Sequence, residues 1–207
     1  MSGKGMSKPV STASILRIAI LGAEATGKST LAAALAAHYH TLWVPEYLRE
    51  FVEITQRPPV AAEQLLIATT QLQREAESAK RVLENAAQGM EQGMEQGMVQ
   101  TSSLLFCDTT PLMTAIYSEH YFVEADSALA RLAAEHDYAA TIVTAPSMPW
   151  VADGMQRDSD AVRQKVHQTL LHKLQQAGIQ YQLVDGSLQQ RVLQSVEYLG
   201  ALLAQTD

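Results

Sequence analysis

Asparagine occurs only once in the 207-residue sequence, as Asn85, which precedes Ala86. The guanine-reading motif Asn-Lys-x-Asp is therefore absent, and so is the His-Arg-Asp loop of protein kinases, which needs an asparagine downstream of its aspartate. Two large classes of phosphate-handling proteins, the GTPase switches and the protein kinases, are excluded on this ground.

Cysteine is as rare, since Cys107 is the only one. A single thiol forms neither an internal disulfide nor a cysteine-rich zinc site, so we expect a reducing, cytoplasmic location. All apolar runs are shorter than the ~20 residues of a membrane span. Residues 1–14 lack the apolar stretch of a signal peptide, and their composition predicts a flexible tail.

Positive charge is also scarce, because 15 Lys and Arg residues stand against 22 Asp and Glu residues and give a formal charge of −7. Such a chain has no general attraction to a nucleic acid backbone or an anionic membrane, so we expect neither as a partner. Hydrophobic residues make up 47% of the chain. This content suits one core, and the length suits a single domain, which we place at residues 15–207.

Apolar runs alternate with helical patterns along this domain. The runs predict strands at 15–21, 41–44, 103–107, 139–143 and 181–184. The 3.6-residue periodicity predicts helices at 28–38, 65–86, 111–121, 128–134, 162–174 and 188–203. Strands separated by helices need crossover connections, so the pattern predicts an α/β fold with a largely parallel central sheet and helices on both faces.

One repeat, QGMEQGMEQGM, interrupts the pattern within residues 88–100. A glycine every four residues weakens a helix by about 1 kcal/mol each, so we predict a low-complexity surface loop. A contact face made of Met90, Met94 and Met98 is the alternative.

The sequence Gly-Ala-Glu-Ala-Thr-Gly-Lys-Ser at residues 22–29 matches the phosphate-loop pattern Gly-x4-Gly-Lys-Ser, between a predicted strand and a predicted helix. Its glycines let the backbone approach phosphate, and the amides at the helix start form an anion cradle. The lysine places a charge on the β- and γ-phosphates, and the serine hydroxyl can bind magnesium. We therefore predict that ATP and Mg²⁺ bind here, held by Gly22, Ala25, Thr26, Gly27, Lys28, Ser29 and Thr30.

Two carboxylates follow predicted strands. Asp108 ends an apolar strand, which beside a phosphate loop is typical of the acid that holds magnesium directly or through water. Glu46 comes just after the second strand, at the edge where ligands of α/β sheets bind. It could accept the proton of an attacking hydroxyl, or it could form an ordinary i,i+3 surface ion pair with Arg49. Spacing alone leaves both open.

Residues 149–157, Pro-Trp-Val-Ala-Asp-Gly-Met-Gln-Arg, follow the strand at 139–143. They combine an aromatic ring, a turn and an arginine, which suggests a mobile lid whose Arg157 stabilises charge on the transferred phosphate. Arg163 is a second, weaker candidate for that role. The alternative is a plain connecting loop.

Four segments together resemble, in this order, the ribosylnicotinamide kinase domain of the NadR proteins and the wider NadR/Ttd14-like phosphate-loop group. They are AILGAEATGKSTL, VPEYLREFVE, LLFCDTT and PWVADGMQR. The resemblance extends from about residue 15 to about residue 203. It implies a thymidylate-kinase-like fold and transfer of the γ-phosphate of ATP to the 5′-hydroxyl of nicotinamide riboside, a step of NAD salvage.

By the same resemblance, Lys28 and Ser29 look like the triphosphate and magnesium residues, and Asp108 looks like the strand-end acid. Glu46, Tyr47 and Arg49 look like substrate-side residues, and Trp150, Asp153 and Arg157 look like lid residues. The resemblance departs at Pro45, where those kinases typically have tryptophan, and at Gln156, which moves the lid arginine one place along. These departures put the acceptor in question more than the reaction.

The leading hypothesis is an ATP- and magnesium-dependent nucleoside kinase with Lys28, Glu46, Asp108 and Arg157 as its catalytic residues. Two alternatives stay open. One is a kinase for another nucleoside or a nucleotide. The other is a regulatory module that binds and slowly hydrolyses ATP.

Overall fold

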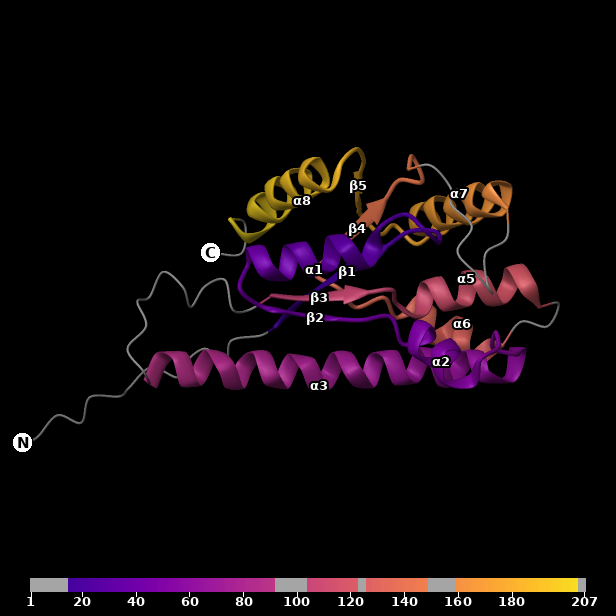
Figure 1. Ribbon diagram of the computed structural model, residues 1–207, viewed down its shortest axis with the longest axis horizontal. Coiled ribbons are helices and arrows are strands. Elements are labelled where there is room, and N and C mark those ends of the chain that lie inside the picture. Colours follow the sequence, from indigo (N-terminus) through magenta and orange to yellow (C-terminus); the bar gives the residue numbers. More distant parts are fainter. Residues whose placement is uncertain (1–14, 92–103, 123–125, 149–158, 205–207) are drawn as a thin grey trace, which may run out of the picture.

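A parallel sheet of five strands forms the centre of the protein, in a computed structural model that describes residues 15–91, 104–122, 126–148 and 159–204 (Figure 1). The strands lie in the order β2-β3-β1-β4-β5, and every neighbouring pair is parallel. Their bounds are β1 (Leu16–Leu21), β2 (Leu42–Val44), β3 (Leu104–Asp108), β4 (Ala140–Thr144) and β5 (Gln182–Val184). The predicted α/β fold with a parallel sheet is confirmed.

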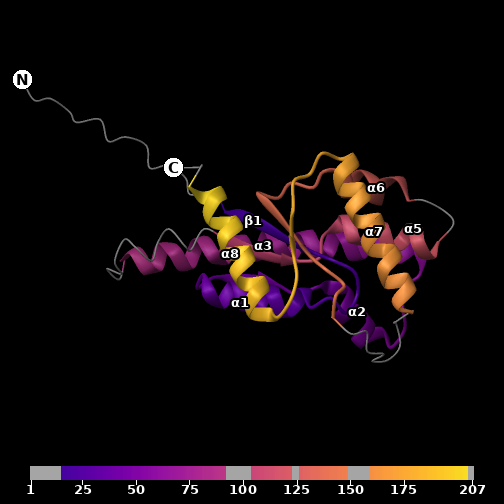
Figure 2. The same ribbon diagram turned by 90° about the horizontal axis from the view of Figure 1, so that it is seen from above.

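Helices cover both faces of the sheet (Figures 1 and 2). One face packs against α1 (Lys28–His38) and α8 (Leu188–Leu203) through Ile18, Ile20 and Phe106. The other packs against α3 (Gln64–Glu91), α5 (Pro111–Tyr121), α6 (Ser127–Ala134) and α7 (Asp160–Gln176). The strand residues alternate between these faces, as the two-residue period of a strand requires. Because both faces are buried, the strands read as unbroken apolar runs.

The strands all end at one edge of the sheet, and β1 lies at its centre between β3 and β4. Ligands of such sheets bind in the crevice outside the carboxyl ends of the strands. Two short elements complete this edge after β2, namely α2 (Tyr47–Thr55) and the 3-10 turn η1 (Ala61–Glu63).

The helix α3 is longer than its sequence pattern predicts. It continues to Glu91, four residues into the segment 88–100 that the glycine repeat predicted to be a loop. A helix that already has six turns propagates at low cost per residue, so one glycine near its end does not stop it. The remainder of the repeat, with Met94 and Met98, and the tail 1–14 lie outside the described residues. None of the helices described is both long and apolar enough to span a bilayer.

A buried carboxylate lies beneath the sheet, near the start of β1. Glu75 of α3 is fully buried and accepts hydrogen bonds from the Tyr138 hydroxyl at 2.9 and 3.0 Å. Arg17 lies 3.5 Å away and also donates to Asp137 at 2.8 Å. Burial raises the pKa of Glu75 to about 7, although Tyr138 and Arg17 lower it.

This pKa makes the stability of the fold depend on pH. The folded state binds the proton of Glu75 more tightly than the unfolded chain, so folding loses stability as the pH rises from about 4.5 through about 7. Glu75→Gln removes this titration. We expect the free energy of unfolding of the variant, relative to the wild type, to rise by about 2–3 kcal/mol from about pH 5 to about pH 8 in urea denaturation. Glu77→Gln, at an exposed position of the same helix, is the control. If the difference in free energy of unfolding between Glu75→Gln and the wild type did not change with pH, the expectation would be contradicted.

Candidate functional site

The phosphate loop connects β1 to α1 at the carboxyl edge of the sheet, where it borders a cavity of about 980 Å³. Gly27 is the N-cap of α1 with φ 81°, and no side chain caps the helix there. The first amides of α1 therefore have no intrahelical acceptor and are available to an anion. All seven residues predicted to cradle the triphosphate line the cavity: Gly22, Ala25, Thr26, Gly27, Lys28, Ser29 and Thr30.

The loop is fixed from behind by β4. The Thr26 hydroxyl donates to the carbonyl of Ala23 at 2.7 Å and lies 2.6 Å from the hydroxyl of Thr144, the last residue of β4. Gly22 has φ 152°, and a Cβ there would overlap the Thr144 hydroxyl. The first glycine of the motif is therefore required by contact with β4 as well as by the turn.

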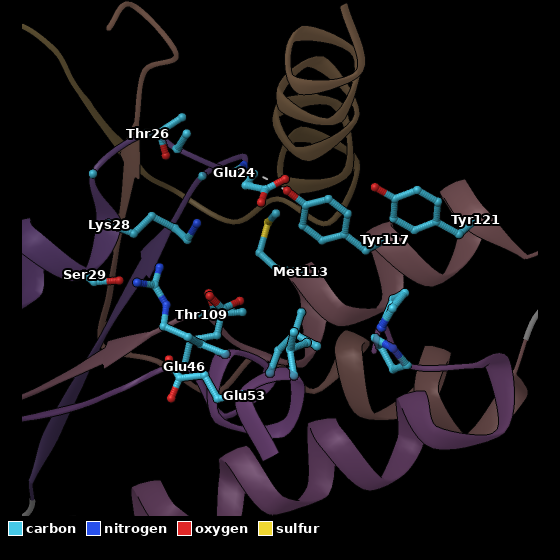
Figure 3. Close-up of a pocket in the computed structure, with 18 of the residues that line it drawn as sticks. Glu24, Thr26, Lys28, Ser29, Glu46, Glu53, Thr109, Met113, Tyr117 and Tyr121 are labelled. Atoms are coloured by element: carbon cyan, nitrogen blue, oxygen red, sulfur yellow. Dashed lines mark hydrogen bonds between the residues drawn. The ribbon is translucent and has the colours of Figure 1, made fainter. Parts of the chain in front are cut away.

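Predicted charged residues from separate elements meet beside this loop (Figure 3). Lys28, Glu46 and Arg49 all line the cavity, and the Lys28 ammonium donates to the carbonyl of Ala23 at 3.1 Å. Asp108 is fully buried just behind them, and neither of its carboxylate oxygens has a hydrogen-bond partner among the described residues. Burial raises the pKa of Asp108 to about 6, with Lys28 opposing and Glu46 adding to the rise. At neutral pH the carboxylate is thus mostly ionised.

The residues after Asp108 are similarly unsatisfied. Thr109 has φ 70°, a rare conformation for a β-branched residue, and its hydroxyl and that of Thr110 are buried without a partner among the described residues. Such orphaned groups are costly unless a ligand or ordered water satisfies them. No cluster of three metal-binding side chains occurs in the described chain. One carboxylate and one hydroxyl nevertheless fit Mg²⁺, which usually takes one or two carboxylates together with phosphate oxygens and water; Asp108 and Ser29 are those residues.

A buried glutamine joins the two strand ends that carry the acids. Gln71 of α3 accepts a hydrogen bond from the Tyr47 amide at 2.8 Å and lies 3.4 Å from the Asp108 carbonyl. This bond satisfies the first amide of α2. The Glu46 carboxylate at the N-cap forms no capping hydrogen bond. Glu46 and Arg49 form no ion pair among the residues described, which leaves both side chains to the cavity.

Tyr47 does not lie where the resemblance implied. It is not among the lining residues, and its ring is covered by the Arg74 guanidinium at 4.5 Å. Arg74 also forms a double hydrogen bond with Glu50. The structure thus assigns Tyr47 to the contact between α2 and α3 and not to the substrate side.

Several lining residues escaped the sequence reasoning. They are Glu24 in the phosphate loop, Glu53 in α2, and Met113, Tyr117 and Tyr121 in α5. The hydroxyl of Tyr117 accepts a hydrogen bond from the Glu24 amide at 2.9 Å, and its ring stacks on that of Tyr121, with centroids 6.2 Å apart and planes 9° apart (Figure 3). The sequence gives one sign of this tyrosine surface. Tyr117 and Tyr121 are four residues apart in a predicted helix, so they share one face of it.

The predicted lid residues Trp150, Asp153 and Arg157 lie outside the described residues. Arg163, the weaker lid candidate, is buried and pairs with Asp160 at 2.6 Å. Its guanidinium also donates to the Met148 carbonyl at 3.0 Å. It therefore holds the chain just before the lid segment and does not reach into the cavity.

Comparisons with known proteins agree with this geometry. The family described as "AAA domain" matches residues 17–191. A crystal structure of NadR protein in complex with NR superposes with TM-score 0.70 at 17% identity, over 90% of this chain and 52% of that one. A NadR protein in complex with NAD and AMP-PNP gives 0.67, also at 17% identity, over 90% of this chain and 50% of that one. The chain thus spans about half the length of these NadR chains.

A third structure extends the likeness to a whole chain. Thymidylate kinase from Ehrlichia chaffeensis superposes with TM-score 0.53 at 12% identity, over 90% of this chain and 99% of that one. At these identities the structural likenesses establish the fold, which is that of phosphate-loop nucleotide-binding proteins. Comparison with curated protein sequences gave no match.

Replacement of Gly22 tests the contact between the phosphate loop and β4. Gly22→Ala places a methyl group against the Thr144 hydroxyl in a backbone conformation that disfavours side chains. We expect the free energy of unfolding to fall by about 1–3 kcal/mol, measured by thermal denaturation. Gly200→Ala in α8 is the matched control, because nothing lies within 4 Å of its Cβ position and alanine favours a helix. Equal stability of the two variants would mean that the loop can move away from β4.

Proposed function

The chain belongs to the AAA domain family. From this membership and the geometry of the cavity, we propose that the protein is an ATP-dependent kinase that phosphorylates the hydroxyl of a nucleoside. The favoured acceptor is nicotinamide riboside. The observation that carries the proposal is the charge of the cavity. The phosphate loop borders the cavity with Glu46 close to Lys28, and Glu53 of α2 and the tyrosines of α5 line the rest of it.

The donor end suits Mg²⁺ and ATP. Lys28 and the amides of α1 can bind the β- and γ-phosphates, and Ser29 and Asp108 can hold the metal ion. When bound, Mg²⁺ would neutralise the charge that develops on the phosphates during transfer. The fold shared with a NadR protein that binds AMP-PNP supports this assignment.

The acceptor end suits a substrate that carries no phosphate. Among the described residues, the charged side chains that line the cavity are Glu24, Glu46, Glu53, Lys28 and Arg49. Lys28 serves the donor, so the other charged side chains of this described lining are three carboxylates and a single arginine. A nucleotide brings a phosphate of about two negative charges, which these carboxylates would repel. A neutral or cationic nucleoside meets no such repulsion.

The ring surfaces favour a planar, electron-poor acceptor. Tyr117 and Tyr121 offer stacked faces beside Met113, and cations are attracted to aromatic faces. Nicotinamide riboside has a planar pyridinium ring with one positive charge, so it matches both the carboxylates and the tyrosines. The NadR structure with NR supports the same acceptor.

The proposed reaction needs one proton acceptor near the attacking hydroxyl. Glu46 lies at the start of α2 with a carboxylate free of capping, beside Lys28 and Asp108, so it can take the proton of the hydroxyl as the oxygen attacks the γ-phosphorus. Arg49 and the predicted lid residue Arg157 would stabilise the charge of the transferred group.

The first experiment measures ADP release from Mg·ATP, alone and with nicotinamide riboside, other nucleosides and nucleoside monophosphates. We expect nicotinamide riboside to stimulate release most and the monophosphates not to stimulate it, because of the acidic acceptor end. Lys28→Ala should abolish turnover and leave the fold intact. Any ADP release that remains in this variant comes from a contaminating enzyme. Stimulation by a monophosphate alone would refute the nucleoside proposal, and no stimulation by any acceptor would indicate a regulatory ATP-binding module instead.

Glu46 and Glu53 form a matched pair for testing the proton acceptor, since both lie in the same helix region and line the same cavity. We expect Glu46→Gln to lower kcat by about 10²–10⁴. Glu53→Gln should change mainly KM for the nucleoside, because it lies about two turns further along α2 than the N-cap Glu46. Full kcat in Glu46→Gln would remove this residue from the proposed mechanism.

A further inference from the structure

A buried arginine of α8, the helix that packs beside α1, contacts the phosphate loop. Arg191 of α8 is only 2% exposed. Its guanidinium donates to the Thr26 carbonyl at 2.5 Å and to the Gly186 carbonyl at 2.9 Å. Longer contacts reach the Ala145 carbonyl at 3.4 Å and the Ser147 hydroxyl at 3.3 Å.

These contacts join three segments that are far apart in the sequence. Thr26 belongs to the phosphate loop, Ala145 and Ser147 follow β4, and Gly186 follows β5. Within this group, Ser147 is also hydrogen bonded to the Asp185 carboxylate. The charge of Arg191 is poorly balanced, because its carboxylate partner, Asp185, is 3.8 Å away and largely exposed.

The bond to Thr26 acts on the phosphate cradle directly. The Thr26 carbonyl and the Gly27 amide belong to one peptide group, so a donor that fixes the carbonyl also fixes the direction of the N–H on the opposite side of the plane. A charged donor on the carbonyl polarises the peptide and makes its N–H a stronger donor. The guanidinium itself lies 3.6 Å from the Cβ position of Gly27, which adds positive potential where phosphate binds.

We propose that Arg191 is a positioning residue for the triphosphate, which holds the Thr26–Gly27 peptide in its phosphate-binding orientation and ties it to the loops after β4 and β5. The inference rests on the nucleotide-binding part of the proposed function and is independent of the acceptor. Arg191 uses three separate nitrogens of its planar fork for the carbonyls of Gly186, Thr26 and Ala145. The compact ammonium of lysine does not reproduce this spacing, so lysine is not an equivalent replacement.

Binding measurements with Mg·ATP and with inorganic tripolyphosphate test the role. Arg191→Met keeps an apolar stem and removes the fork. We expect the Kd for both ligands to rise about ten- to a hundredfold, which is the loss of one charge-assisted hydrogen bond network. Arg191→Lys should give an intermediate Kd. Tripolyphosphate is the informative probe, because it contacts the phosphate loop without a base or a sugar.

The control is Arg17→Met, which removes a packed arginine with two carboxylate partners near the start of β1, at the other edge of the sheet. It should lower the melting temperature but leave both Kd values unchanged at a temperature where all variants are folded. Wild-type Kd values in Arg191→Met would overturn the proposal. If Arg191→Met does not fold, wild-type Kd values in Arg191→Lys would overturn it instead. Weakened binding in a protein that phosphorylates no nucleoside would support Arg191 and refute only the kinase proposal.

Discussion

The structure depends on one constraint: the first amides of α1, at the end of the phosphate loop, must stay without an intrahelical acceptor beside the cavity. A loop in that state gains little from its own hydrogen bonds, and ordering it costs about 1–2 kcal/mol per residue. The surrounding fold therefore has to hold it. Thr144 of β4 contacts the Thr26 hydroxyl, Tyr117 of α5 accepts a hydrogen bond from the Glu24 amide, and Arg191 of α8 donates to the Thr26 carbonyl. Preorganisation of this kind removes an entropic cost from binding.

The order of the strands follows from the same requirement. With β1 at the centre, its loop can be reached from β3 on one side and from β4 on the other. The β3 side contributes Asp108, whose ionised form burial disfavours. A buried acid whose oxygens meet no geometric hydrogen-bond partner in the described part of the chain, next to Thr109 in a rare backbone conformation, costs stability that the apolar core must offset. Such a cost is expected where a ligand supplies the missing partners.

Sequence patterns predicted most of the fold, because they report local properties. Because β1 and β3 are buried on both faces, their sequences are apolar runs that predict strands. Helical periodicity predicted α1 and α5 with the same bounds that the structure has. For the same reason, the motif put Lys28 at the start of α1 and the apolar run put Asp108 at the end of β3, where the structure has them. The contact of Tyr117 with Glu24 and that of Arg191 with Thr26 span 93 and 165 positions. No local pattern encodes such contacts, and the environment of Tyr47 depended on Arg74 of another helix in the same way.

Fold alone does not distinguish a nucleoside acceptor from a nucleotide acceptor, since one sheet and one phosphate loop serve proteins as different as NadR and a thymidylate kinase. The distinction has to come from side chains at the acceptor end. A carboxylate near a phosphate dianion is unfavourable in any dielectric, and the low dielectric of a closed site increases the penalty. In the proposed function, the three glutamates and one arginine of the described lining would act mainly by repelling a phosphorylated acceptor, which is how a pocket excludes the wrong acceptor even when its shape would fit.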